Sequence, residues 1–236
     1  MLYPIIMSSI AGISTLIGAL FIYIKVKDIN KIISFSLSMS LSVMIMISIF
    51  DLIPASLPYI NGNILIFIIF ISLGYLVVKI LDRIFNNNDN LYKIGIISLI
   101  ALMIHNLPEG ILTFFTTYQN KKLGLAIASS IAMHNIPEGI SIAVPLYYSG
   151  YKKSRVILIT FLSGIVEPIG GLISFLLLKN YINDFLISIL LLLVAGIMIT
   201  LSIDKMLGEV SALKRPNYFW FGLILGIIIC IINIII

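Results

Sequence analysis

The sequence predicts an all-α membrane protein of eight transmembrane helices, in one polytopic domain that covers residues 1–236. Of its 236 residues, 60% are hydrophobic and 11% are charged, and the mean hydropathy of +1.16 is too high for a water-soluble globule. Apolar runs of roughly 20 residues, the length that crosses a bilayer as a helix, recur along the whole chain. The connections between these runs are short, so consecutive helices must run antiparallel.

Turn-forming residues separate the apolar runs. Asn-Gly-Asn at residues 61–63 and an asparagine-rich run at 86–90 interrupt the hydrophobic pattern, and Pro216 suits the start of a helix. We therefore expect spans at residues 2–24, 32–55, 62–84, 91–117, 121–148, 153–178, 183–205 and 216–236. An even number of spans requires that both termini lie on the same side of the membrane.

Lysine and arginine are distributed unevenly between the two sides of the predicted bundle. Of the 15 basic residues, only Lys121, Lys122 and Lys179 fall in even-numbered loops, and the other 12 lie in or beside the odd-numbered loops. The positive-inside rule then predicts a protein of the cytoplasmic membrane with odd loops in the cytoplasm and both termini outside. Because topology accounts for the net charge of +5, no nucleic-acid partner is expected.

One six-residue phrase occurs twice, near the middle of the fourth and fifth spans. HNLPEG at residues 105–110 returns as HNIPEG at residues 134–139, and the two copies hold both histidines of the chain. Since the two spans are antiparallel, the copies enter the bilayer from opposite sides, which predicts an inverted repeat about an axis in the membrane plane. A weaker echo relates residues 44–51 of the second span to residues 198–204 of the seventh.

The repeated phrase has the chemistry of a metal site. Within each copy His and Glu are four residues apart, on one face of a helix, and Asn lies beside them. Imidazole, carboxylate and amide ligands suit Zn(II), Fe(II), Mn(II) or Co(II), whereas Cu(I) favours Cys or Met. A further glutamate falls in the middle of the sixth span, where an unpaired charge costs several kcal/mol. The candidate ligands are His105, Asn106, Glu109, His134, Asn135, Glu138 and Glu167.

Prolines and two aspartates complete the predicted site. Pro108 and Pro137 each lack a backbone donor, so we expect the fourth and fifth helices to kink and to free a carbonyl group. Asp51 and Asp204 lie near span ends, where they would cap a helix or attract cations at the two mouths of a pathway.

The paired HNxPEG phrases, followed by Glu167 in the next span, resemble the ZIP family of divalent-metal transporters and in particular its bacterial zinc-uptake members. The resemblance covers the whole chain and implies a ZIP-like arrangement with a midplane site, often binuclear, in which the two glutamates of the phrases bridge the ions. It implies one ion held by His105, Glu109, His134 and Glu138, and a neighbouring ion held by Asn106, Asn135, Glu167 and the bridging glutamates. It also implies Zn²⁺ as the leading substrate, with Fe²⁺, Mn²⁺, Co²⁺ and Cd²⁺ as others, and no prosthetic group.

The expected function is secondary transport, and the expected partners are divalent metal ions and the lipid bilayer. The sequence has no P-loop, so the ion gradient or the membrane potential must supply the driving force. The alternative from another class is an intramembrane zinc-dependent hydrolase, which would need an open zinc position and usually a His-Glu-x-x-His arrangement that this sequence lacks. A cation channel is a second alternative, and a homodimer is left open.

Overall fold

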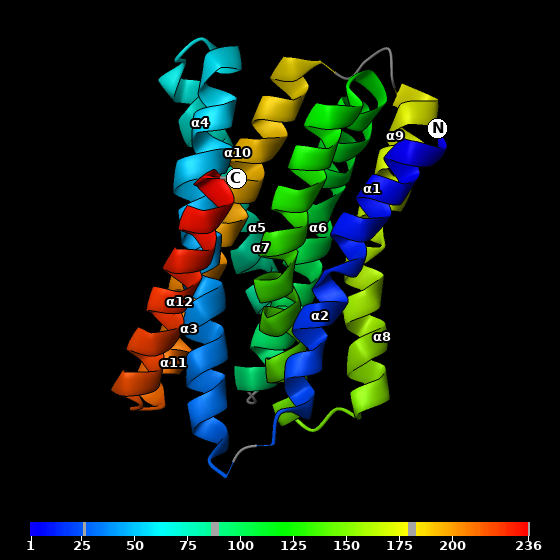
Figure 1. Ribbon diagram of the computed structural model, residues 1–236. Helices are drawn as coiled ribbons and strands as arrows, with labels where there is room; N and C mark the ends of the chain where they lie inside the picture. The colour runs from blue at the N-terminus through cyan, green and yellow to red at the C-terminus, as the bar shows by residue number, and fades with distance from the viewer. Residues whose placement is uncertain (26, 86–89, 179–182, 236) are drawn as a thin grey trace.

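The computed structural model describes residues 1–25, 27–85, 90–178 and 183–235, and these form eight long helical rods (Figure 1). In chain order the rods are α1–α2–η1 (Leu2–Ile13, Thr15–Ala19, Leu20–Tyr23), α3–η2–α4–η3 (Ile29–Ile47, Ser48–Leu52, Ile53–Ser56, Leu57–Ile60), α5 (Ile64–Ile84), α6 (Asn90–Gln119), α7 (Lys121–Tyr148), α8–α9 (Lys153–Gly164, Val166–Leu178), α10–η4–α11 (Asp184–Thr200, Leu201–Met206, Leu207–Ala212) and α12 (Pro216–Ile235). The all-helical prediction is therefore confirmed.

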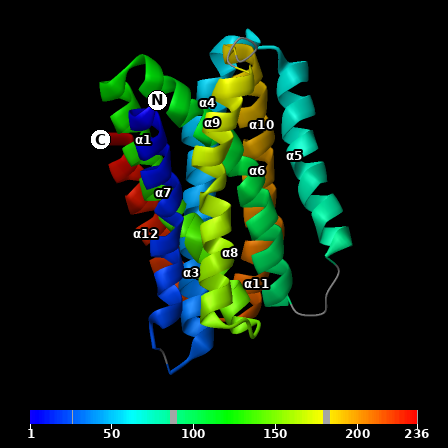
Figure 2. The ribbon, with the colours of Figure 1, turned by 90° about the vertical axis from the view of Figure 1, so that its right-hand side faces the viewer.

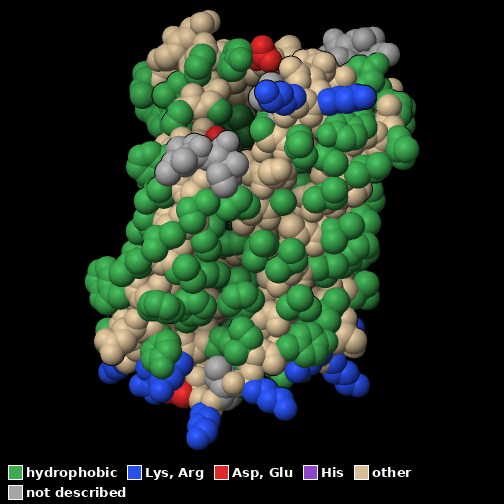
Figure 3. Space-filling model, in the orientation of Figure 1, with side chains coloured by type: hydrophobic (Ala, Val, Ile, Leu, Met, Phe, Trp, Pro, Cys, Tyr) green, Lys and Arg blue, Asp and Glu red, His purple; other side chains and the backbone are tan. Residues whose placement is uncertain are grey.

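The surface of the bundle is that of a multi-pass membrane protein. Within the described residues, 6 rods are long and apolar enough to cross a membrane, and the other two rods are α7 and α12. Large hydrophobic side chains cover the middle of the molecule, while Lys and Arg gather mainly at one end (Figure 3). We call this end the basic end. α12 finishes toward the opposite end, at which α1 begins (Figure 1).

The rods pack in two groups. In the first, which we call the site group, α6 and α7 pack against each other and against α1, α2, α8 and α9. In the second, the support group, α3 packs against α12 and α5 packs against α10. Of these rods, α5 lies at an outer edge of the bundle (Figure 2). Close backbone contact joins rods within each group, as where Gly12 of α1 faces the backbone of Gly164. The two groups meet chiefly where α7 lies against α3.

Two rods contain a π-helical turn at corresponding places. These turns are η2 and η4, and they coincide with the two segments that share the weaker sequence echo. Each includes one aspartate, Asp51 in η2 and Asp204 in η4. π-helical turns are rare overall, but those that occur are often found at functional sites. The same irregularity in both segments therefore supports a structural correspondence behind the weaker sequence echo.

Proline lies inside both helices that carry the repeated phrase. Pro108 is within α6, and Pro137 and Pro145 are within α7, and both helices continue on either side of them. The kinks expected at Pro108 and Pro137 stay a prediction.

Candidate metal centre

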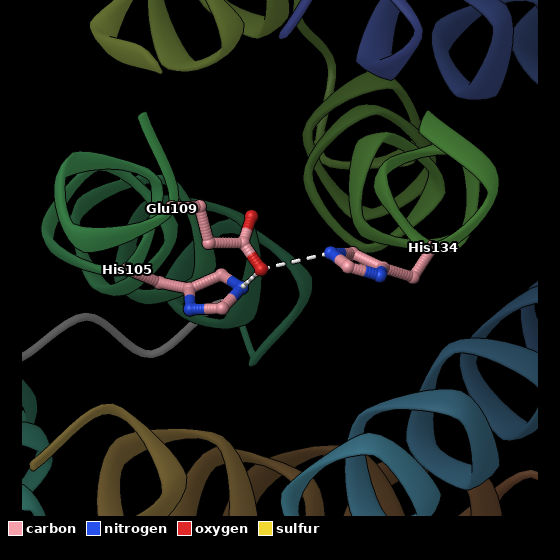
Figure 4. Close-up of side chains that lie close together, drawn as sticks. All are labelled: His105, Glu109 and His134. Carbon is pink, nitrogen blue, oxygen red and sulfur yellow. Dashed lines mark hydrogen bonds and ion pairs between the residues drawn. The ribbon is translucent and has the colours of Figure 1, made fainter. Parts of the chain in front are cut away.

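The two copies of the repeated phrase meet because α6 and α7 are antiparallel neighbours. His105 and Glu109 of α6 point toward His134 of α7 (Figure 4). Glu109 Oε1 lies 2.8 Å from His134 Nε2 and 3.2 Å from His105 Nε2. The ligating atoms of these three side chains all lie within 4.8 Å of one another, so the group could hold one metal ion. All three side chains are buried.

Glu138 adds a second residue of the α7 copy to the same cluster. Its Oε1 lies 3.0 Å from His105 Nε2, and the side chain is fully buried. Separations of 2.8 to 3.2 Å between nitrogen and oxygen in the cluster are slightly below the roughly 3.3 Å that separates ligand atoms around a tetrahedral zinc ion. A small outward shift of each side chain would therefore admit an ion.

A second set of polar side chains lies next to this cluster. The amide of Asn135 donates one hydrogen bond to Glu167 Oε1, at 2.5 Å, and another to the carbonyl of Ala11, at 2.8 Å. The amide of Asn106 instead donates to the carbonyl of Ser163, at 2.9 Å. Because both amide nitrogens are occupied by acceptors, both amide oxygens are left available as ligands. Of the seven predicted residues, the structure thus joins four in one cluster and pairs Asn135 with Glu167, while Asn106 bonds to backbone.

Several oxygens of the site are buried without a hydrogen-bond partner among the described residues. They are Asn106 Oδ1, Glu109 Oε2, Asn135 Oδ1, Glu138 Oε2 and Glu167 Oε2. Buried polar atoms are nearly always paired, since leaving one unpaired costs about 1 to 3 kcal/mol and more for a charged group. A cation bound among these oxygens would compensate that cost.

Small residues that follow the glutamates allow the neighbouring helices to approach. A Cβ atom at Gly110 would overlap the backbone of Glu167, and one at Gly139 would overlap the backbone of Thr15. The glycine after Glu109 therefore lets α9 bring Glu167 against α6. The close approach of a neighbouring backbone to each copy explains why both phrases end in glycine.

Asp51 and Asp204, which the sequence placed together as candidates for pathway mouths, have different surroundings. Asp51 is exposed, and it is near enough to His134 and Glu109 to interact with them electrostatically. Asp204 belongs to an ion-pair network at the basic end, with Lys79 Nζ 2.6 Å away. Asp51 thus lies near the candidate cluster, and Asp204 is not a member of it.

Comparison with known proteins agrees with this geometry. The family model described as "ZIP Zinc transporter" matches residues 87–233, which is more than half of the chain. The zinc transporter ZupT of Oceanobacillus iheyensis is 31% identical over 99% of this chain and 97% of its own length, and that of Streptococcus mutans is 30% identical over 97% and 95%. The zinc transporter ZupT of Clostridium perfringens is 42% identical over a shorter stretch, 62% of this chain and 52% of its own length. The chain belongs to the ZIP zinc transporter family.

Three contacts that support the site in this ZIP-family chain have no counterpart in the sequence analysis. The carbonyls of Ala11 and Ser163 orient Asn135 and Asn106, and Ser40 donates to the carbonyl of Pro137 at 2.6 Å. Backbone carbonyls carry no sequence signal. Ser40 is one of several buried serines spaced two residues apart on α3. This regular spacing is the one sequence feature that could have indicated that Ser40 makes a buried contact.

Proposed function

We propose that this chain carries zinc into the cytoplasm by secondary transport across the cytoplasmic membrane. The observation that carries the proposal is the buried His105, Glu109 and His134 group between two antiparallel helices. Carboxylates in the interior of a membrane bundle mark ion pathways, because their charge is costly without a partner. Membership of the ZIP family makes transport, rather than hydrolysis, the use of such a site.

We further propose that the site holds two ions. The first would be bound by His105, Glu109, His134 and Glu138. The second would be bound by Asn106, Asn135 and Glu167, with the two glutamates of the repeated phrases as bridges. The unpaired buried oxygens of this set support the proposal. Fe²⁺, Mn²⁺, Co²⁺ and Cd²⁺ suit the same nitrogen and oxygen ligands and are proposed as further substrates.

The proposed orientation places the basic end in the cytoplasm and both termini outside. The concentration of Lys and Arg at the basic end supports this orientation (Figure 3). An ion would arrive past Asp51 and leave past Asp204 and Glu209. A divalent ion drawn inward gains about 4.6 kcal/mol per 100 mV, twice the single-charge value. The paired π-helical turns support an inverted repeat. During transport the site group would move against the support group, and its helices α6 and α7 would be kinked at Pro108 and Pro137.

Zinc uptake into liposomes tests the proposal. Purified protein is reconstituted with a zinc-sensitive dye inside, and uptake is followed at increasing external zinc with and without an inside-negative potential. We expect saturable uptake that the potential accelerates. Flux that fails to saturate would favour a channel, and stoichiometric zinc binding without uptake would favour the hydrolase.

Asn106→Asp is expected to change the ion preference. The substitution adds a carboxylate to the proposed second ion site and removes the amide that donates to Ser163. Because carboxylate ligands suit Mn²⁺ well, we expect uptake of Mn²⁺ to rise a few-fold relative to Zn²⁺. Competition between the two ions in the liposome assay measures this ratio. Asn63→Asp is the matched control, since Asp replaces Asn equally well at the helix cap that Asn63 provides. An unchanged ratio in Asn106→Asp would exclude Asn106 as a ligand.

A further inference from the structure

At the basic end, α6 meets the support group through charged side chains. Lys93 Nζ of α6 lies 2.8 Å from Asp82 Oδ1 of α5, and Lys205 Nζ of η4 lies 2.6 Å from the same oxygen. The three side chains are only 15 to 23% exposed, so water screens these pairs less than it screens a surface pair. Asp82 therefore ties one helix of the site group to two elements of the support group.

This tie lies where the two groups have little other contact. α6 packs mainly on α7 and α9, and it touches α5, α10 and η4 of the support group over few residues. Two neighbouring ion pairs between described residues stay within the support group. Lys79 to Asp204 joins α5 to η4, and Arg215 to Asp28 joins the starts of α12 and α3. The pair formed by Lys93 and Asp82 is thus placed to oppose separation of α6 from the support group.

A cavity lies at the same boundary, and two of the elements that line it, α6 and η4, each carry a buried hydroxyl. Lys93 and Ile94 of α6 and Lys205 of η4 help to line a cavity of about 220 Å³ at the basic end. One turn further into the bundle, Ser98 is completely buried and lies on the face of α6 that carries His105, seven residues on. The hydroxyls of Ser98 and of Ser202 in η4 have no hydrogen-bond partner within the described part of the chain. Ser98 lies between Ile94, which lines the cavity, and His105 on one face of α6, so its unpaired hydroxyl indicates a polar route along that face.

We propose that Lys93, Asp82 and Lys205 form an ion-pair latch that closes the cytoplasmic mouth of this route, and that the ion leaves past Ser98 and Ser202 after Lys93 releases Asp82. The inference rests on the proposed transport function. While the latch is closed, its ammonium groups occupy the carboxylate that a cation would otherwise approach, and their charge repels a divalent ion. Movement of α6 away from α5 breaks the pair and removes one of these charges from the mouth.

The latch is tested by the accessibility of a cysteine at position 98. Ser98→Cys is a near-isosteric reporter, made in a Cys230→Ser background because Cys230 is the one native cysteine. The protein is placed in nanodiscs, which leave both faces open, and the rate of labelling by a membrane-impermeant maleimide is measured. Lys93→Gln is expected to raise that rate about tenfold, which corresponds to about 1.4 kcal/mol in favour of the open mouth.

Lys79→Gln is the matched control, because it removes the same type of charge from the same network without touching a contact between the two groups. Its labelling rate should equal that of the parent. Asp82→Asn should reproduce the effect of Lys93→Gln and replaces it if that variant does not fold. Parent-like labelling of both, or an equal rise in Lys79→Gln, would overturn the latch. Labelling does not require transport, so the two proposals can fail separately. If Lys93→Gln and Asp82→Asn are labelled at the parent rate while the parent protein takes up zinc normally, the latch is rejected and the transport function stands.

Discussion

Glu109→Gln is expected to lower zinc affinity by at least about a hundredfold and to reduce uptake to that of protein-free liposomes. Glu109 Oε1 contacts imidazole nitrogens of both helices, His134 at 2.8 Å and His105 at 3.2 Å. Glutamine keeps the shape of the side chain but removes the charge that a divalent ion requires. Loss of a group that merely orients a metal ligand already costs about 10- to 100-fold, so loss of a ligand should cost at least as much. Equilibrium dialysis with zinc and the liposome assay measure the two effects.

The matched control for this substitution is Asp184→Asn. Asp184 is an exposed carboxylate in the first turn of α10, outside the metal cluster, so its variant should bind and transport zinc like the parent. Glu138→Gln should behave like Glu109→Gln, because Glu138 contacts His105 from the opposite helix. A Glu109→Gln protein of normal abundance that takes up zinc normally would contradict the site assignment.

Hydropathy and turn residues predicted the rods well where polar residues coincide with helix ends. α7 occupies Lys121–Tyr148 and α8–α9 occupies residues 153–178, as expected from the sequence. The seventh rod was predicted to end at residue 205 but continues to Ala212. The apolar run stops at the charged residues near Asp204, whereas helical hydrogen bonding continues through them because it does not depend on hydropathy. Span ends predicted from hydropathy therefore mark the edge of the bilayer rather than the end of the helix.

The grouping of the candidate ligands could be predicted because its geometry is local. His105 and Glu109 are one helical turn apart, and the second copy supplies the same pair on the adjacent helix. The supporting contacts are not local. The carbonyl that orients Asn135 is 124 residues away, and Lys93 and Asp82 belong to different packing groups. Such contacts depend on how the rods pack, which the periodicity of a single helix does not specify.

Gly12→Val is expected to destabilise the site group and to weaken zinc binding. A Cβ atom at Gly12 would overlap the backbone carbonyl of Gly164, and Pro168 Cδ would lie 3.3 Å away. Backbone cannot rotate aside as a side chain can, so α1 must move away from α8. Overpacking of this kind costs about 1 to 3 kcal/mol, which for a chain of this size lowers Tm by roughly 2 to 12 °C. Displacing α1 also moves the carbonyl of Ala11, which holds the amide of Asn135.

Gly208→Val separates this packing effect from the intrinsic cost of valine in a helix. Gly208 is also helical, but a Cβ atom there meets nothing within 4 Å in the described structure. Thermal unfolding of the purified proteins in detergent and zinc dialysis are compared for the two variants. We expect Tm and zinc affinity to fall in Gly12→Val and to stay close to the parent values in Gly208→Val. Equal Tm values in the two variants would mean that α1 yields without cost, and close packing of α1 on α8 would then have no part in holding Asn135 against Glu167.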